Sequence, residues 1–165
     1  MTRAYFAGGC FWCMTPVFRD AGAEKAVCGY SGGEEATPSY EDVKAQKTGH
    51  RETIMVEYDP EKVSYGKLLD IFLENVDPFD AGGQFIDRGR SYTLAVYYCS
   101  EEERALAEAR IRQLEEESGR TACIALEPFA VFWDAEEYHQ DYDLKHPEEF
   151  ERELRESGRK KQAED

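Results

Sequence analysis

The chain has 165 residues, enough for one domain, and its 41% hydrophobic and 13% aromatic content excludes extensive disorder. The formal net charge of −15 opposes binding to nucleic-acid phosphates. No apolar run approaches the ~20 residues that a membrane-spanning helix needs, and the first residues lack the pattern of a secretory signal. We therefore expect a monomer in the cytoplasm, with no membrane or nucleic-acid partner.

Short strands and helices alternate along the chain, without repeats or low-complexity segments. Strands are predicted at residues 4–7, 26–30, 54–58, 92–98 and 123–126, and helices from about residues 15, 64, 101, 134 and 147. The alternation of apolar residues at 54, 56 and 58 predicts a strand with one buried face. Residues 77–91 are rich in Pro, Gly and Asp and predict a long loop, whose length alone indicates a function.

Two helix starts carry clear capping signals. Ser64 is a plausible N-cap, and Ser100 with Glu103 forms the pattern of a capping box. The alternation of elements predicts an α/β (α+β) fold for one domain at residues 1–157, followed by a charged, frayed tail at residues 158–165.

The segment FAGGCFWCMTPVF, residues 6–18, carries the strongest chemical signal. Cys10 falls in the turn or at the start of the helix, where unpaired N–H groups lower a thiol pKa. The two preceding glycines would let a substrate approach the sulfur, and Phe11 and Trp12 offer apolar surface for a small group such as an S-methyl. Cys13 is within reach for a disulfide if the segment is helical. The same residues also suit a structural or metal-binding CxxC and ordinary core packing.

Three further residues become informative only together. Glu52 stands among apolar neighbours of a predicted strand, where burial would raise its pKa and let it donate a proton at neutral pH. The alternative is an exposed strand glutamate. Asp87 and Tyr92 lie at the end of the long loop, where such residues usually cap turns and pack edges.

Six segments then form a pattern: GGCFWC, GYSGG, PSYEDV, TGHRETIMVEYDP, the GGQF-DRG-SY loop and EEYHQDY. In this order they resemble the A-type peptide methionine sulfoxide reductases, over about residues 3–150. The resemblance implies a two-layer α/β roll with a mixed sheet flanked by helices. It also implies reduction of methionine-S-sulfoxide, free or in proteins, to methionine, with no cofactor and no metal.

The resemblance assigns roles to single residues. Cys10 is the implied nucleophile, which becomes a sulfenic acid, and Glu52 is the implied acid that protonates the sulfoxide oxygen. The residues implied to contact the substrate are Phe11 and Trp12 at its methyl group, Tyr40 and Tyr92 at its oxygen, and Asp87. His50 is expected to be structural, and residues 138–140 with Tyr142 are expected at the rim of the pocket.

The chain departs from many relatives, which carry glycine at the position of Cys13 and recycle through cysteines in a glycine-rich C-terminal tail. No cysteine follows Cys123 here. We expect Cys13 to resolve the sulfenic acid, with Cys28 as the second candidate and Cys99 and Cys123 as packing thiols. Thioredoxin or a similar dithiol would then reduce the disulfide.

Three alternatives remain open at this stage. One is a general CxxC thiol–disulfide oxidoreductase, and another is a small zinc module built from Cys10, Cys13, Cys28 and His50. The third is a non-catalytic acidic binding domain in which the thiols are incidental.

Overall fold

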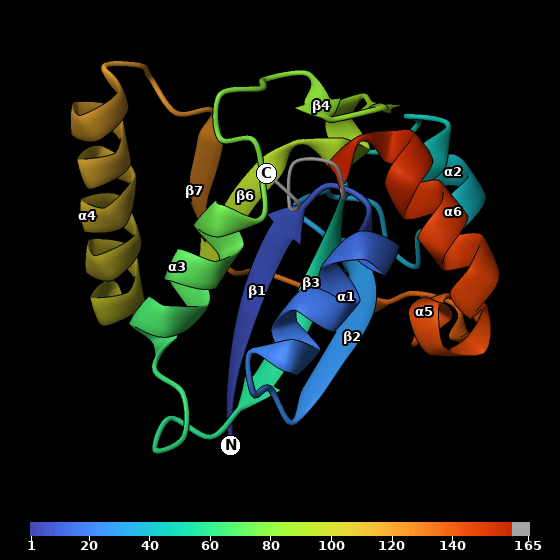
Figure 1. The fold of residues 1–165 in the computed structure, drawn as a ribbon, viewed down its shortest axis with the longest axis horizontal. Helices are drawn as coiled ribbons and strands as arrows, with labels where there is room; N and C mark the ends of the chain where they lie inside the picture. Colours follow the sequence, from blue (N-terminus) through green and yellow to red (C-terminus); the bar gives the residue numbers. More distant parts are fainter. Residues whose placement is uncertain (160–165) are drawn as a thin grey trace.

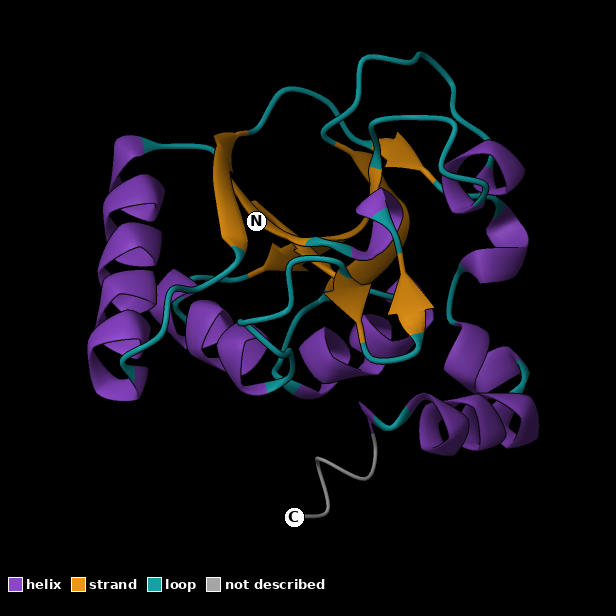
Figure 2. Cartoon of the chain, turned by 90° about the horizontal axis from the view of Figure 1, so that it is seen from above, coloured by secondary structure: helices purple, strands orange, loops and turns teal. Residues whose placement is uncertain are grey.

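A computed structural model describes residues 1–159, and its centre is a curved six-stranded sheet (Figures 1 and 2). The strand order is β7-β6-β1-β3-β2-β8. The strands are Thr2–Gly8 (β1), Lys25–Ser31 (β2), Arg51–Tyr58 (β3), Leu94–Tyr98 (β6), Ile124–Pro128 (β7) and Trp133–Asp134 (β8). Strands β6 and β7 are parallel and the other neighbours are antiparallel, so the sheet is mixed, as predicted.

The helices frame this sheet. They are Phe11–Asp20 (α1), Tyr40–Lys44 (α2), Tyr65–Glu74 (α3), Glu101–Ser118 (α4), Tyr142–Lys145 (α5) and Pro147–Ser157 (α6). Helices α1 and α3 lie side by side against one face of the sheet, and α4 lies beyond α3, next to β7 (Figure 1). The predicted loop at 77–91 contains a short hairpin, Gly83–Gln84 (β4) and Asp87–Arg88 (β5), and a 3-10 turn at Arg90–Tyr92.

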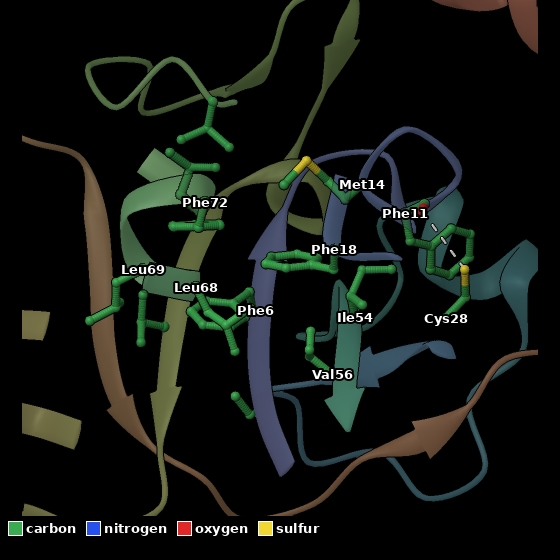
Figure 3. Close-up of a cluster of buried hydrophobic side chains, with 14 of the residues drawn as sticks. Phe6, Phe11, Met14, Phe18, Cys28, Ile54, Val56, Leu68, Leu69 and Phe72 are labelled. Carbon is green, nitrogen blue, oxygen red and sulfur yellow. Dashed lines mark hydrogen bonds between the residues drawn. The ribbon is translucent and has the colours of Figure 1, made fainter. Parts of the chain in front are cut away.

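The main core lies between the sheet and helices α1 and α3 (Figure 3). Phe6 of β1 is fully buried and pairs with Ile54 of β3 and Val96 of β6. Its ring stacks on Phe18 of α1 at 5.1 Å and on Phe72 of α3 at 5.3 Å. One aromatic side chain of the central strand thus holds both helices against the sheet.

Strand β3 is buried on both faces, so the prediction of a single buried face was wrong. Ile54 and Val56 face the helices, as the alternation indicated. Met55 faces the other way, into a second cluster with Tyr5 and Tyr97. The connection between β7 and β8 covers that cluster, with the Phe129 ring stacked on Tyr5 at 4.0 Å. This cover comes from residues about 75 positions along the chain, so the local pattern could not reveal it.

Helix α1 begins at Phe11, four residues before the predicted start at Thr15, and Pro16 lies inside it. Its first N–H is bonded by a side chain from β3 rather than by a local capping residue. The prediction failed because a tertiary contact supplies the cap. The other two caps are present: Ser64 accepts from Lys67 N at 3.1 Å, and Ser100 accepts from Glu103 N at 3.2 Å. The Glu103 carboxylate accepts from Cys99 N, one residue before the position that a capping box would use.

The tail predicted from residue 158 lies outside the described residues from 160 onward. Its described part departs from the predicted fraying. Gly158 ends α6 with φ +88°, and Arg159 then turns back into the domain, where it is buried. None of the described helices is both long and apolar enough to cross a membrane.

The position of Phe6 gives a stability prediction. Phe6→Ala removes a fully buried ring that contacts two helices, and we expect the free energy of unfolding to fall by about 3–5 kcal/mol. Chemical denaturation measures this loss. Leu144→Ala, at a side chain that is 64% exposed, is the control and should change stability by less than about 0.5 kcal/mol. Equal losses in the two variants would contradict this description of the core.

Candidate active site

One cavity of about 350 Å³ at the N-terminal end of α1 brings together most of the predicted site residues. Its lining contains eight of the nine: Cys10, Phe11, Trp12, Cys13, Tyr40, Glu52, Asp87 and Tyr92. They come from α1, α2, β3, β5 and the 3-10 turn before β6. The remaining one, Cys28, does not line the cavity.

Cys10 is the N-cap residue of α1 and is partly exposed. Cys10 follows the end of strand β1 and is joined to it by Gly8 and Gly9. Gly9 has φ +89°, a left-handed conformation that favours glycine, and a Cβ there would meet Arg159 and Gln84, each at 2.8 Å. The space beside Gly9 is filled by protein. The expectation that the glycines open a path for substrate was therefore wrong, because they let the chain pack closely.

Glu52 connects β3 to the start of α1. It is 1% exposed, and its Oε1 accepts the Phe11 N–H at 3.1 Å. Burial raises the pKa of the Glu52 carboxyl to about 8, and the N–H bond from Phe11 opposes this rise without cancelling it. The carboxyl is therefore mostly protonated at pH 7, as the sequence analysis proposed for an acid.

The proton of Glu52 belongs on Oε2, and Glu52 lines the cavity. Oε1 is occupied as an acceptor, whereas Oε2 is buried and has no hydrogen-bond partner among the described residues. An unpartnered buried polar atom is costly unless a ligand satisfies it. Oε2 is thus a proton donor without an acceptor, in the cavity that Cys10 also lines.

Cys10 and Cys13 lie within hydrogen-bonding distance of each other. This bond raises the pKa of the Cys10 thiol, and burial adds to the rise, so the prediction that the helix start lowers this pKa was wrong. The same bond lowers the pKa of the Cys13 thiol. Interacting thiols titrate as a pair, so the first proton leaves more readily than the second. The reduced site can hold one negative charge that the two sulfurs share.

Aromatic contacts fix the position of Trp12, which lines the cavity. The Trp12 indole stacks on Tyr142 at 4.0 Å, and its Nε1–H donates to His139 Nδ1 at 2.9 Å. His139 is fully buried and its ring lies 4.2 Å from that of Tyr40. Of the residues predicted at the rim, 138–140 and Tyr142, two therefore hold Trp12 in place, His139 and Tyr142.

The two tyrosines and Asp87 are placed by different elements. The backbone N–H of Tyr40 at the start of α2 donates to Glu136 at 2.9 Å, and Tyr92 ends the 3-10 turn. Burial raises the pKa of both phenols, so their O–H groups stay protonated and available as donors. Burial also raises the pKa of Asp87.

Cys28 is fully buried in the core beside Phe11 (Figure 3) and does not line the cavity. It contacts Thr15 Oγ1 at 3.3 Å and the Phe11 carbonyl oxygen at 3.8 Å. Burial raises the pKa of its thiol to about 12, so it is not a ready nucleophile. Cys99, which we predicted to be a packing thiol, is instead exposed.

His50 has the structural role expected of it. It is fully buried, accepts from Gly33 N at 3.2 Å and donates to the Glu35 carbonyl at 2.7 Å. Within residues 1–159, no three His, Cys, Asp or Glu side chains are grouped to hold a metal ion. The four residues of the zinc alternative are not grouped in this way.

Sequence reasoning missed two cations near the site. Lys44 lines the cavity and lies 5.7 Å from the Tyr40 ring, one helical turn along α2. That i, i+4 spacing from Tyr40 was a usable signal. Arg159 packs behind Gly9, and nothing in its charged local sequence indicated burial.

A cysteine pair, a protonated buried carboxyl and two phenols around one small cavity define a thiol-dependent redox centre. The chain matches the family model for peptide methionine sulfoxide reductase over residues 2–165. The peptide methionine sulfoxide reductase MsrA of Bacillus velezensis is 45% identical over 163 residues, covering 94% of this chain and 90% of that protein. The chain belongs to the peptide methionine sulfoxide reductase family.

Solved structures agree with this assignment and with the predicted fold class. The reduced form of Mxr1 from Saccharomyces cerevisiae has a TM-score of 0.82 at 29% identity, covering 89% of this chain and 86% of that one. Mxr1 from the same organism in complex with Trx2 has a TM-score of 0.57 at 22% identity, covering 86% and 84% of the two chains.

The pKa of Glu52 predicts how stability depends on pH. The carboxyl titrates near 4.5 when unperturbed and near 8 in the folded protein. Between these values the folded state binds more protons than the unfolded state, so stability is lost as pH rises. Relative to Glu52→Gln, which cannot titrate, we expect the wild-type free energy of unfolding to fall by roughly 4 kcal/mol from pH 4.5 to pH 8.5. Urea denaturation of both proteins measures the difference, and a constant difference across this window would contradict the raised pKa.

Proposed function

We propose that this chain reduces the S epimer of methionine sulfoxide, free or within proteins, with Cys10 as nucleophile and Glu52 as proton donor. The observation that carries this proposal is the unpartnered Glu52 Oε2 in the same cavity as Cys10. Thiol–disulfide exchange can proceed with a thiolate as leaving group, so a general oxidoreductase depends less on a buried acid. A sulfoxide needs one, since oxide is a very poor leaving group.

In the first step the Cys10 sulfur attacks the sulfoxide sulfur. As Cys10 attacks, its proton moves to Cys13, and Glu52 gives its proton to the sulfoxide oxygen. The sulfoxide S–O bond then breaks, the hydroxyl adds to the Cys10 sulfur, and the bond between the two sulfurs breaks. Cys10 is left as a sulfenic acid, and methionine leaves with a reduced sulfur. Tyr40 and Tyr92 donate hydrogen bonds to the oxygen while its negative charge develops, and one such donor can be worth ~3 kcal/mol.

Selection of one epimer follows from two fixed contacts around a tetrahedral sulfur. Phe11 and Trp12 hold the methyl group on the apolar side, and Glu52 with the tyrosines holds the oxygen on the polar side. The third substituent, the methionine chain, must then leave through the open mouth, beside Asp87. The mirror-image sulfoxide would exchange methyl and oxygen and leave Glu52 Oε2 without an acceptor.

In the second step Cys13 resolves the sulfenic acid. Its sulfur attacks Cys10 sulfur, the S–S bond forms, the S–O bond breaks, and the hydroxide leaves as water after protonation. The lowered pKa of Cys13 supports this assignment, and the buried, protonated Cys28 is disfavoured. We propose thioredoxin or a similar dithiol as the reductant, in line with the structure of Mxr1 in complex with Trx2. We place the enzyme in the cytoplasm, where such donors keep thiols reduced.

A single-turnover experiment tests the reaction and the resolving thiol together. Reduced protein is mixed with racemic blocked methionine sulfoxide without reductant, and we expect loss of the S epimer alone with a new Cys10–Cys13 disulfide. Cys28→Ser should behave like wild type, whereas Cys13→Ser should release methionine and accumulate the sulfenic acid. The matched control is Cys99→Ser, at an exposed thiol. Reduction of insulin disulfides with no sulfoxide loss would instead favour the general oxidoreductase.

The role of Glu52 predicts both a rate loss and its pH dependence. In the wild type, methionine release should decline as pH rises through about 8, because Glu52 then loses the proton it must donate. Glu52→Gln should slow that step by roughly 10²–10³-fold and remove this alkaline decline. Rapid-quench measurements between pH 6 and 10 give both. A variant with wild-type rates would show that another group supplies the proton.

A further inference from the structure

Arg159 is a buried cation immediately behind the cysteine pair. Gly158 ends α6 in a left-handed conformation, so that the chain turns back and Arg159 is only 8% exposed. Its Nη2 donates to the Gly8 carbonyl at 3.0 Å, and its Nη1 donates to the Asn75 carbonyl at 2.8 Å and to Met14 Sδ at 3.2 Å. The guanidinium thus lies against the residue two before Cys10 and the residue after Cys13.

The three hydrogen-bond acceptors of Arg159 are neutral, and among residues 1–159 no carboxylate forms an ion pair with its guanidinium. The nearby Asp87 interacts with this charge without bonding to it. On its other side it lies over the Phe85 ring at 4.7 Å. A buried charge without a counterion is costly, and such a site gains most when a nearby group becomes negative.

A second cavity shows which ionisable thiol lies near Arg159. It has a volume of about 660 Å³ and is lined by Arg159 together with Cys13 and by Val17, Asn75 and Phe85. Cys13 lines both cavities, whereas Cys10, Glu52 and Asp87 line only the first. Cys13 is therefore the thiol that shares a space with the unpaired cation.

We propose that Arg159 is a positioning residue for the second step, holding negative charge on Cys13 so that its thiolate attacks the Cys10 sulfenic acid. This inference rests on the proposed role of Cys13 and goes beyond it, since it names the group that activates the resolving thiol. The bond that forms is Cys13 Sγ–Cys10 Sγ, and the bond that breaks is Cys10 S–O. The thiol proton that Cys13 gives up and the departing hydroxide together make one water, so Arg159 neither gains nor loses a proton.

Most of the titratable groups around Cys13 are acids, so Arg159 is one of few positive charges that can stabilise its thiolate. The groups that line a cavity with Cys13 are Cys10 and Asp20 of α1, Lys44 of α2, Glu52 of β3, Glu74 of α3, Asp87 of β5, and Glu153 and Glu156 of α6. Apart from Lys44, all of these are neutral or negative at pH 7. The pKa of Cys13 is lowered first by its bond to Cys10 and then, against the effect of burial, by the charge of Arg159. Asp87 and Glu153 act in the opposite direction.

The test follows closure of the disulfide as a function of pH. Reduced wild type, Arg159→Met and Arg159→Lys are each mixed with one equivalent of blocked methionine-S-sulfoxide and quenched in acid. Mass spectrometry after thiol labelling reports sulfenic acid and disulfide, and chromatography of the same samples reports methionine. The matched control is Arg155→Met, which removes a 69% exposed arginine from the same helix.

For Arg159→Met we expect the rate of disulfide formation to reach its half-maximal value at a higher pH, because loss of the positive charge raises the pKa of Cys13. A shift of about one unit makes closure roughly tenfold slower at pH 7, with recovery at pH 10. Arg159→Lys keeps the charge and should lie near wild type, as should Arg155→Met. A merely structural role would slow closure equally at every pH.

Three results would overturn the inference while leaving the proposed reaction intact. The first is an unchanged pH midpoint of disulfide closure in Arg159→Met. The second is an equal loss of closure rate in Arg159→Lys. The third is a defect confined to methionine release, which would mean that Arg159 acts on Asp87 and the substrate instead of on Cys13. If the wild type releases no methionine, or if Cys13→Ser closes a disulfide at the wild-type rate, the proposed function itself fails.

Discussion

The contact between the Glu52 carboxyl and the Phe11 N–H is the interaction on which the site depends. It joins the central sheet to the first turn of α1, so it sets where Cys10 stands relative to the acid. It also divides the two oxygens of Glu52 by function. Oε1 accepts the first N–H of the helix, and Oε2 has no partner among the described residues. In the proposed reaction the same carboxyl therefore caps the helix and donates the proton.

The site manages charge with few cations, which matters in a chain that carries 35 acidic and 20 basic residues. Burial keeps Glu52 and the two phenols protonated, so the cavity holds donors instead of repelling anions. The cysteine pair lies at the N-terminus of α1, and the charge of Arg159 lowers the pKa of Cys13. Cys13 lines both cavities. Cys10 and Glu52 line the first one with it, and Arg159 lines the second.

The local sequence was sufficient where the reason for a structure is local. The caps at Ser64 and Ser100 lie where the sequence placed them, because each bonds a backbone N–H three residues ahead. It was insufficient where a distant segment completes an element. Helix α1 begins earlier than predicted because Glu52 caps it. Strand β3 is buried on both faces because Phe129 and its neighbours cover the second one. Glycine is needed at position 9 because Arg159 fills the space beside it.

By itself, the sequence determined the α/β class, the family and eight residues that line one cavity. These residues belong to short motifs, and a short motif can be recognised along the chain without the structure. Only the tertiary structure decided that Cys28 faces the core, that His139 and Tyr142 hold Trp12, and that the C-terminal arginine is buried behind the cysteines. The reason is physical. Burial, pKa and the direction of a side chain depend on which distant segments pack together, and no pattern of neighbours along the chain encodes that packing.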